Sequence, residues 1–143
     1  MSEDVQSVAP KRMNKGSNAP MPTVLVVDDD KNILEAFRIF LESENCRMLA
    51  SMDVDDAMEK ARNNKVDLLI TDFYLKTKSS VELYTLIRKV FPEIPIAVIT
   101  GYPEYIGETD AKVFGADYYF TKPLELNKMR EVVRNACFPK SGE

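Results

Sequence analysis

The chain has 143 residues, of which 45% are hydrophobic and 29% are charged, a composition typical of one globular domain. Its formal net charge of −4 argues against non-specific binding to nucleic acid, and no apolar stretch reaches the roughly 18 residues of a membrane span. The absence of histidine, together with only two cysteines, excludes histidine-based catalytic triads and the usual zinc sites. We therefore expect a cytoplasmic protein in which Cys46 and Cys137 are free thiols.

The two ends of the chain lack the patterns of regular structure. Residues 1–22 contain three prolines, several small polar residues and no apolar periodicity, which predicts a flexible N-terminal tail. Residues 139–143 are too few to form a further domain, and we expect them to be a short C-terminal tail. The sequence thus predicts one folded domain over residues 23–138.

The first half of this domain predicts alternating strands and helices. The apolar run Thr23–Val27 is typical of a buried strand, and apolar residues at helical spacing follow over Lys31–Ser43. Asp30 is placed to cap that helix, which favours a capping role over a role as a metal ligand. Cys46–Ser51 predicts a weaker strand. A second helix, capped by Asp53, has an apolar stripe formed by Val54, Ala57, Met58 and Ala61.

The stretch Val66–Leu75, which reads VDLLITDFYL, suits a central strand of a parallel sheet because its first residues have no polar face. The apolar run stops at Asp72. Five further elements continue the alternation. These are a helix with Leu83, Leu86, Ile87 and Val90 on one face, a strand within Ile94–Thr100, a helix over Tyr105–Phe114 closed by Gly115, and a strand over Asp117–Thr121; a last helix covers Glu125–Cys137.

Five alternations of strand and helix predict an α/β fold in which a parallel sheet carries helices on both faces. Polar residues follow the strands at their ends: Asp28 and Asp29 the first, Asp72 the third, Thr100 the fourth and Lys122 the fifth. Because the carboxyl ends of parallel strands lie on one edge of a sheet, we expect these side chains to meet in one cleft.

Three aspartates in one cleft require positive charge nearby. Two carboxylates about 4 Å apart repel each other by roughly 4 kcal/mol at an effective dielectric constant of 20. Oxygen ligands with open positions suit Mg²⁺ or Mn²⁺, and Lys122 adds another positive charge. A carboxylate nucleophile, a divalent cation, a lysine and the Thr100 hydroxyl together favour phosphoryl transfer to an aspartate.

Four segments of the sequence resemble the signature segments of a known family. The segments V-V-D-D-D, T-D-F-Y-L, I-T-G and Y-Y-F-T-K-P are similar in order and spacing to those of the receiver domain of bacterial two-component response regulators, over about residues 22–137. The resemblance implies a flavodoxin-like (βα)5 fold with a doubly wound, parallel, five-stranded sheet in the order 2-1-3-4-5. It also implies a signalling phosphoacceptor, with no enzymatic chemistry beyond its own phosphorylation and dephosphorylation.

The resemblance assigns a role to each acidic residue of the predicted cleft. Asp72 would be the phosphoacceptor. Asp29 would bind Mg²⁺ directly, and Asp28 would act mainly through water. The carboxylate of Asp72 and the backbone carbonyl of Tyr74 would be further ligands of the metal.

The resemblance also implies a switch and partners. Thr100 would be the switch hydroxyl, Tyr119 the switch aromatic and Lys122 the lysine that pairs with the phosphoryl group, followed by a cis bond to Pro123. A sensor histidine kinase or a histidine phosphotransfer protein would donate the phosphoryl group. A downstream protein would bind the face formed by the fourth helix, the fifth strand and the fifth helix, and Tyr102 is expected to be a surface aromatic that can border such a face.

Two positions depart from the family pattern, and two alternatives stay open. The family commonly has a proline four residues and a glycine eight residues after the phosphoacceptor, where this chain has Lys76 and Ser80; this leaves the dephosphorylation rate open. Asp28-Asp29-Asp30 also satisfies the Asp-x-Asp pattern of haloacid-dehalogenase phosphatases, although the acidic residues beyond Lys122 fall on a helix. The other alternative is a protein-interaction module on the same fold that is not phosphorylated.

Overall fold

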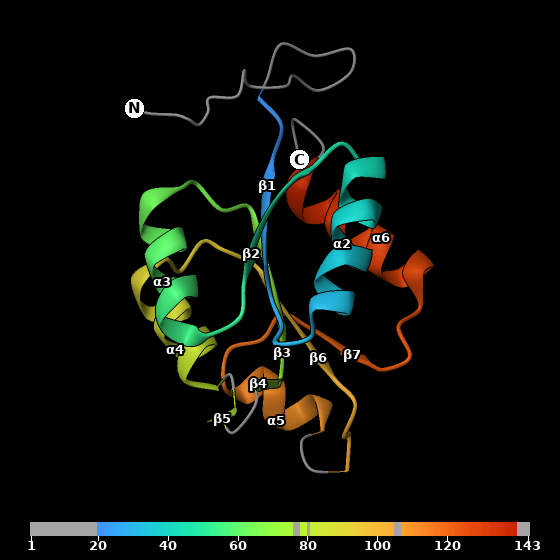
Figure 1. The fold of residues 1–143 in the computed structure, drawn as a ribbon. Helices are drawn as coiled ribbons and strands as arrows, with labels where there is room; N and C mark the ends of the chain where they lie inside the picture. The colour runs from blue at the N-terminus through green and yellow to red at the C-terminus, as the bar shows by residue number, and fades with distance from the viewer. Residues whose placement is uncertain (1–19, 76–77, 80, 105–106, 140–143) are drawn as a thin grey trace.

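The computed structural model describes residues 20–75, 78–79, 81–104 and 107–139. Its main sheet has five parallel strands in the order β2-β1-β3-β6-β7 (Figure 1). Counted along this sheet, the order is 2-1-3-4-5, so the predicted fold is confirmed. The strands are β1 (Thr23–Val27), β2 (Arg47–Ser51), β3 (Leu68–Asp72), β6 (Ile96–Thr100) and β7 (Tyr118–Thr121).

Helices cover both faces of the sheet. Figure 1 shows α2 and α6 on one side and α3 and α4 on the other. The side chains of β1 alternate between the two layers: Val24 and Val26 pack with residues of α2 and α6, and Leu25 and Val27 pack with residues of α3 and α4. The helices are α2 (Lys31–Ser43), α3 (Val54–Asn63), α4 (Val81–Val90), α5 (Glu108–Val113) and α6 (Leu126–Cys137).

The predicted helix ends are present. The Asp30 side chain accepts a hydrogen bond of 2.9 Å from the backbone N–H of Asn32, which caps α2 as expected. Asp53 caps α3 in the same way. Gly115 follows α5 with a φ of 120°, and the backbone N–H of the next residue, Ala116, bonds to the carbonyl of Ala111. This positive φ favours glycine, so Gly115 closes α5 as predicted.

Two predicted elements have different bounds in the structure. The strand predicted within Val66–Leu75 ends at Asp72 as expected, but it begins at Leu68 and not at Val66. Tyr74–Leu75 forms β4, which pairs with β5 (Lys78–Ser79) in a separate antiparallel sheet. The helix predicted over Tyr105–Phe114 is only α5. Tyr105 lies outside the described residues, and Gly107 has extended backbone with a ψ of 173°, which excludes it from the helix.

Three other elements begin one residue later than predicted. Cys46 donates its backbone N–H to the carbonyl of Leu41, so it lies in the turn between α2 and β2 and not in β2. Asp117 precedes β7, and its side chain accepts a hydrogen bond of 2.8 Å from the backbone N–H of Ile96. Glu125 is the N-cap of α6 and not its first residue.

Several predictions fall on residues that the structure does not describe. They include most of the N-terminal tail over residues 1–22, residues 140–143 of the C-terminal tail, and the departures from the family pattern at Lys76 and Ser80. Among the described residues, no helix combines the length and the apolar character that a membrane crossing requires.

Candidate functional site

The residues directly after β1 and β7 form backbone hydrogen bonds with the neighbouring strand. These bonds fix the positions of the site residues at the ends of the strands. Asp28 directly follows β1 and donates its backbone N–H to the carbonyl of Ser51 at 3.0 Å. Asp72 is the last residue of β3. Lys122 directly follows β7 and donates its backbone N–H to the carbonyl of Thr100 at 2.8 Å. These three residues therefore share the carboxyl edge of the sheet, as the sequence predicted.

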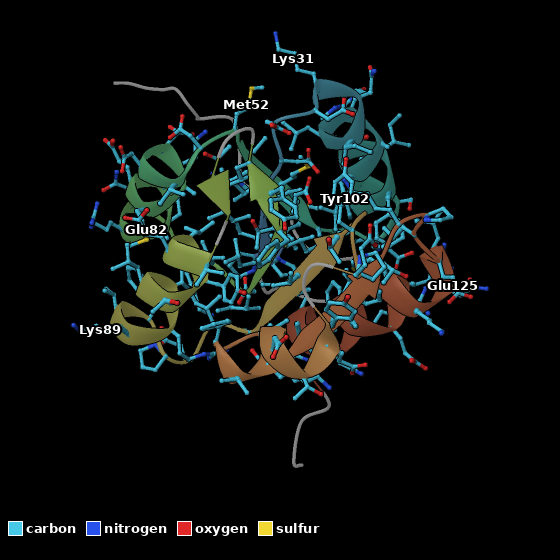
Figure 2. The ribbon with its side chains drawn as sticks, turned by 90° about the horizontal axis from the view of Figure 1, so that it is seen from below. Lys31, Met52, Glu82, Lys89, Tyr102 and Glu125 are labelled. Atoms are coloured by element: carbon cyan, nitrogen blue, oxygen red, sulfur yellow. The ribbon has the colours of Figure 1, made fainter. Side chains whose placement is uncertain are left out.

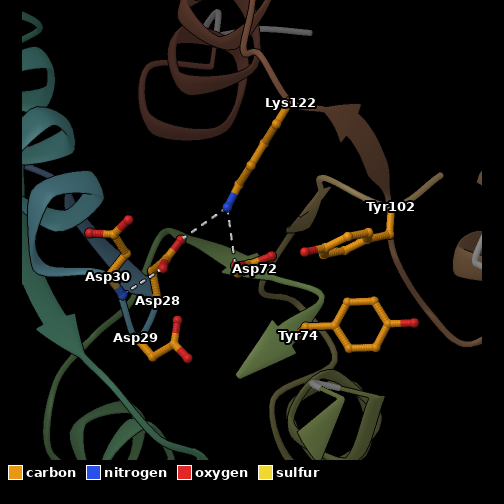
Figure 3. Close-up of a pocket in the computed structure, with 7 residues that line it drawn as sticks. All are labelled: Asp28, Asp29, Asp30, Asp72, Tyr74, Tyr102 and Lys122. Carbon is orange, nitrogen blue, oxygen red and sulfur yellow. Dashed lines mark hydrogen bonds and ion pairs between the residues drawn. The ribbon is translucent and has the colours of Figure 1, made fainter. Parts of the chain in front are cut away.

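The side chains at this edge meet in an acidic cleft. One carboxylate oxygen from each of Asp28, Asp29 and Asp72 lies within 4.8 Å of the other two. The Nζ atom of Lys122 lies 3.2 Å from Oδ2 of Asp72 and 3.8 Å from Oδ2 of Asp28 (Figure 3). The structure thus brings together four of the side chains that the sequence assigned to one cleft.

The electrostatics of the cleft follow from burial. Asp28 is 3% exposed, and burial raises the pKa of its carboxyl to about 6, although it accepts a hydrogen bond from the backbone N–H of Asp30. Burial also raises the pKa of Asp72, while Lys122 opposes that rise. Burial alone would lower the pKa of Lys122, but the carboxylates of Asp72 and Asp28 raise it overall. The cleft therefore holds more negative charge than Lys122 compensates.

This donor set fits a divalent cation. Three carboxylates supply only hard oxygen ligands, which suit Mg²⁺ or Mn²⁺, and the cation would relieve the repulsion among Asp28, Asp29 and Asp72. The backbone N–H of Tyr74 bonds to the Asp72 carboxylate and so supports its position. Asp30 lines the cleft, but its side chain caps α2.

Thr100 is the last residue of β6, and Tyr119 lies in the neighbouring strand β7. Thr100 is fully buried, and its Oγ1 accepts a hydrogen bond of 2.9 Å from the backbone N–H of Tyr102. It does not line the cleft. Tyr119 is partly buried and pairs with Val98 in the sheet register. Since Val98 and Thr100 are two residues apart on one strand, Tyr119 and Thr100 face the same side of the sheet.

The side chains of Tyr74 and Tyr102 are the part of the cleft that the sequence did not predict. Both line a cavity of about 470 Å³ with the three aspartates, Asp30 and Lys122. Tyr102 is 52% exposed, as expected of a surface aromatic, yet it belongs to the cleft. Seen from the carboxyl edge, Tyr102 lies near the centre of the molecule, inside a ring of peripheral residues such as Lys31 and Glu82 (Figure 2). A usable signal was present, because each tyrosine follows a polar strand-end residue by two positions.

Comparisons of the sequence with known proteins identify response regulators as relatives. The family model of the response regulator receiver domain matches residues 24–134. The response regulator protein PilR of Pseudomonas aeruginosa is 32% identical over 119 residues, which are 83% of this chain and 27% of PilR. The first curated relatives are all longer than this chain, which spans between about a quarter and a half of their length.

Solved structures of response regulators have the same fold as this chain. A two-component response regulator from Clostridium difficile has a TM-score of 0.75 and 27% identity, covering 81% of this chain and 95% of that one. The receiver domain of Ssk1 from Saccharomyces cerevisiae, solved with the histidine phosphotransfer protein Ypd1, has the same fold, with a TM-score of 0.74 and 18% identity over 82% of this chain and 90% of that one. The phosphatase alternative receives no support. Because the family model matches most of its length, the chain belongs to the response regulator receiver domains, the phosphoacceptor domains of two-component signalling.

Proposed function

We propose that Asp72 is the phosphoacceptor of this receiver domain. The observation that carries the proposal is the 3.2 Å separation between Nζ of Lys122 and Oδ2 of Asp72, in a cleft that two further carboxylates share. An aspartate in a purely structural role would not need an acidic pair beside it. A carboxylate that receives a phosphoryl group needs both a lysine and a cation site within reach, because it acquires three more charged or polar oxygens.

Receiver domains generally bind Mg²⁺, and the residues of this cleft fit that ion. We assign it to Asp29, Asp72 and the backbone carbonyl of Tyr74 as direct ligands, with Asp28 acting mainly through water and Mn²⁺ as an equivalent ion. A bound divalent cation would supply positive charge to the oxygens of the transferring phosphoryl group. Burial raises the pKa of Asp28, and a cation beside it would favour the ionised carboxylate.

The protein's own groups then carry out the transfer. A carboxylate oxygen of Asp72 attacks the phosphorus of a phosphohistidine, the new O–P bond forms, and the P–N bond breaks with its electron pair returning to the imidazole nitrogen. The ammonium group of Lys122, already beside Oδ2 of Asp72, pairs with phosphoryl oxygens as they arrive. The same cleft accounts for self-phosphorylation from a small phosphodonor and for later hydrolysis of the acyl phosphate.

The proposed switch consists of Thr100 and Tyr119. The Thr100 hydroxyl accepts a hydrogen bond from Tyr102 and still has its own hydrogen to donate to a phosphoryl oxygen. Movement of Thr100 toward the phosphoryl group would change the space beside Tyr119, which faces the same side of the sheet. The output face would then be α5, β7 and α6, where Val113 is 76% exposed and Phe114 is 47% exposed.

The partners we propose follow from this chemistry. The donor is a sensor histidine kinase or a histidine phosphotransfer protein, and the Ssk1 receiver domain, solved with Ypd1, supports the latter class. The output partner is a protein, with no nucleic acid or membrane bound by this chain. The cytoplasmic location remains a prediction.

Labelling with a small phosphodonor tests the phosphoacceptor. With Mg²⁺ and acetyl phosphate, intact-mass spectrometry should show one added phosphoryl group that is stable in acid and labile in base. Asp72→Asn should show none. Asp30→Asn is the matched control, since Asp30 lines the same cleft but caps a helix, and it should still be labelled. Equal labelling of wild type and Asp72→Asn would reject the assignment.

A further inference from the structure

The two cysteines of the chain, Cys46 and Cys137, lie at the amino edge of the sheet, and we call them the cysteine pair. Cys46 directly precedes β2, whose first residue, Arg47, pairs with Thr23 at the start of β1. Cys137 is the last residue of α6. Figure 1 shows α2 and α6 side by side, with the end of α6 at the edge where β1 begins. The pair is therefore at the opposite edge of the sheet from the acidic cleft.

The two thiols are in contact with each other. Both cysteines are free in the structure, and their side chains are hydrogen-bonded to one another. They share one apolar layer, in which Cys46 is 4% exposed and the partly buried Cys137 packs against the buried residues. The Cys46 thiol also donates a hydrogen bond of 3.6 Å to the carbonyl of Glu44. Two thiols in contact on separate backbone segments can form a disulfide with little backbone movement.

The segments that carry the cysteine pair are held together by other contacts. Glu44, two residues before Cys46, accepts hydrogen bonds from the side chains of Arg130 and Arg134 in α6. The carbonyl of Arg134 also accepts a hydrogen bond of 2.9 Å from the backbone N–H of Phe138, the residue after Cys137. The last turn of α6 is thus fixed beside the turn that follows α2. Because these contacts already order both segments, bond formation loses little further conformational entropy.

We propose that Cys46 and Cys137 form a reversible intramolecular disulfide, with a low-molecular-weight disulfide as the oxidant, and that this bond fixes the end of α6 to the turn after α2. The inference does not rest on the proposed function of Asp72, since neither cysteine lines the acidic cleft. Disulfides of proteins in reducing compartments are usually transient or redox-sensing, which suits a reversible bond. The cysteine pair is then a site of oxidative modification that acts on α6.

The reaction consists of two thiol–disulfide exchanges. The thiolate of Cys137 attacks one sulfur of the oxidant, a new S–S bond forms, and the S–S bond of the oxidant breaks to release one thiolate. The thiolate of Cys46 then attacks the sulfur of Cys137 and displaces the second thiolate. The two protons lost by the cysteine pair pass through water to the released thiolates. The chain is oxidised by two electrons, and the oxidant is reduced to two thiols.

Exposure decides which cysteine reacts first. Cys137 is partly exposed, and its neighbour Ala136 lines a cavity of about 400 Å³ together with Asp67, which directly precedes β3. Cys46 is buried and is assigned the second step. The hydrogen bond with Cys46 and burial raise the pKa of the Cys137 thiol, so little thiolate is present at neutral pH. The first exchange should therefore be slow.

Oxidised glutathione tests the cysteine pair on the full chain in the absence of reductant. After incubation for hours, intact-mass spectrometry should show a monomer that is about 2 Da lighter, because two hydrogens leave, and dithiothreitol should restore the original mass. Proteolysis without reductant should yield one linked pair of peptides that contain Cys46 and Cys137. A stable glutathione adduct, a disulfide-linked dimer or an unchanged mass of the wild type would each overturn the inference.

Two variants test the order of the two exchanges. Cys46→Ala should stop at one glutathione adduct on Cys137, because no second thiol remains to displace the glutathione. Cys137→Ala should stay unmodified, because the remaining thiol is buried. Modification of Cys137→Ala at the rate of the wild type would overturn the assigned order. If either variant fails to fold, the linked peptides of the wild type still decide whether the bond forms.

Amide hydrogen exchange tests what the bond does to the helix. In the oxidised wild type, exchange in the last turn of α6 should slow by at least about threefold relative to the reduced protein. Helix α3, on the other face of the sheet, is the internal control and should exchange equally in both forms (Figure 1). Equal exchange at the end of α6 in the two forms would reject the fixing of the helix.

Discussion

The carboxylate of Glu44 accepts a hydrogen bond of 3.0 Å from Nε of Arg134, a residue 90 positions later. Arg130, one helical turn before Arg134, donates its Nε to the other carboxylate oxygen at 2.9 Å. The side chain of Glu44 is only 8% exposed, and the Arg130 guanidinium also lies 5.7 Å from the ring centroid of Phe40. Glu44 therefore joins the end of α2 to α6 across one face of the sheet.

Glu44→Gln should lower the free energy of unfolding by about 1–2 kcal/mol, because it leaves two arginines without their buried counter-charge. The expected loss of free energy is this small because the Arg134 side chain is 63% exposed, and solvent screens that part of the interaction. Urea denaturation measures the loss. Glu42→Gln is the matched control, since the Glu42 side chain is 56% exposed, and should change stability by less than about 0.5 kcal/mol. Equal losses in both variants would contradict a specific role for Glu44.

Asp28 should make stability depend on pH in the absence of divalent cations. Its pKa is about 6 in the folded protein, above the ordinary aspartate value of 3.8, so its ionised form opposes folding. The stabilising effect of the protonated form is complete below about pH 4 and is lost as the pH rises through 6. Asp28→Asn should therefore raise the free energy of unfolding by about 1–2 kcal/mol at pH 8. In EDTA, this advantage should shrink as the pH falls from 7 to 5; a constant advantage would show that Asp28 does not titrate there.

Asp29 and Asp30 should differ in their effect on metal binding, although they are adjacent. Asp29 offers an oxygen to the carboxylate cluster, whereas the Asp30 side chain bonds to the backbone of Asn32. Asp29→Ala should weaken Mg²⁺ binding by at least about tenfold, the loss expected when one ligand carboxylate is removed. Asp30→Ala should leave the affinity within about threefold and cost helix stability instead. Isothermal titration calorimetry gives both affinities, and comparable losses would mean that the ligands are misassigned.

The protein should be more stable when the side chain at position 84 lacks the hydroxyl of Tyr84. Its side chain is fully buried, its hydroxyl has no hydrogen-bond partner among the described residues, and burial raises its pKa to about 12. Tyr84→Phe should raise the free energy of unfolding by about 1 kcal/mol, because it removes an unsatisfied polar group and keeps the ring. Tyr84→Ala, which empties the same site, should lower it by about 3 kcal/mol or more. A loss of stability in Tyr84→Phe would show that the hydroxyl has a partner, such as a buried water.

Thr100→Ala should separate phosphorylation from switching. The variant removes the hydroxyl but keeps the Asp72 acceptor and the carboxylate cluster, so a small donor should still label it. In the wild type, phosphorylation should change the NMR chemical shifts around Tyr119 and α6, because a new charge-assisted bond to Thr100 shifts the balance between two conformations. These changes should be much smaller in Thr100→Ala. Changes as large as those of the wild type would exclude the hydroxyl as the coupling group.

The strands, the helices and most of the cleft could be predicted from the sequence because their signals are local. A strand such as Thr23–Val27 is recognisable from its unbroken apolar run, and a helix such as α6 from apolar residues at helical spacing. A parallel sheet then places every strand end on one edge, so Asp28, Asp72 and Lys122 converge whatever the details of the loops. The family resemblance added the strand order, which the structure confirms.

Tertiary structure alone decided the features that depend on distance and burial between remote residues. The contact of Tyr74 with Tyr102 depends on how β4 and the segment after β6 are placed, and no local sequence pattern encodes that separation. The raised pKa of Asp28 results from desolvation and from carboxylates elsewhere in the chain, so the residue type alone cannot give it. Glu44 reads as an ordinary polar residue after a helix until α6 brings two arginines to it. Periodicity reports which side of an element is apolar, whereas these properties depend on which groups lie within a few ångströms after folding.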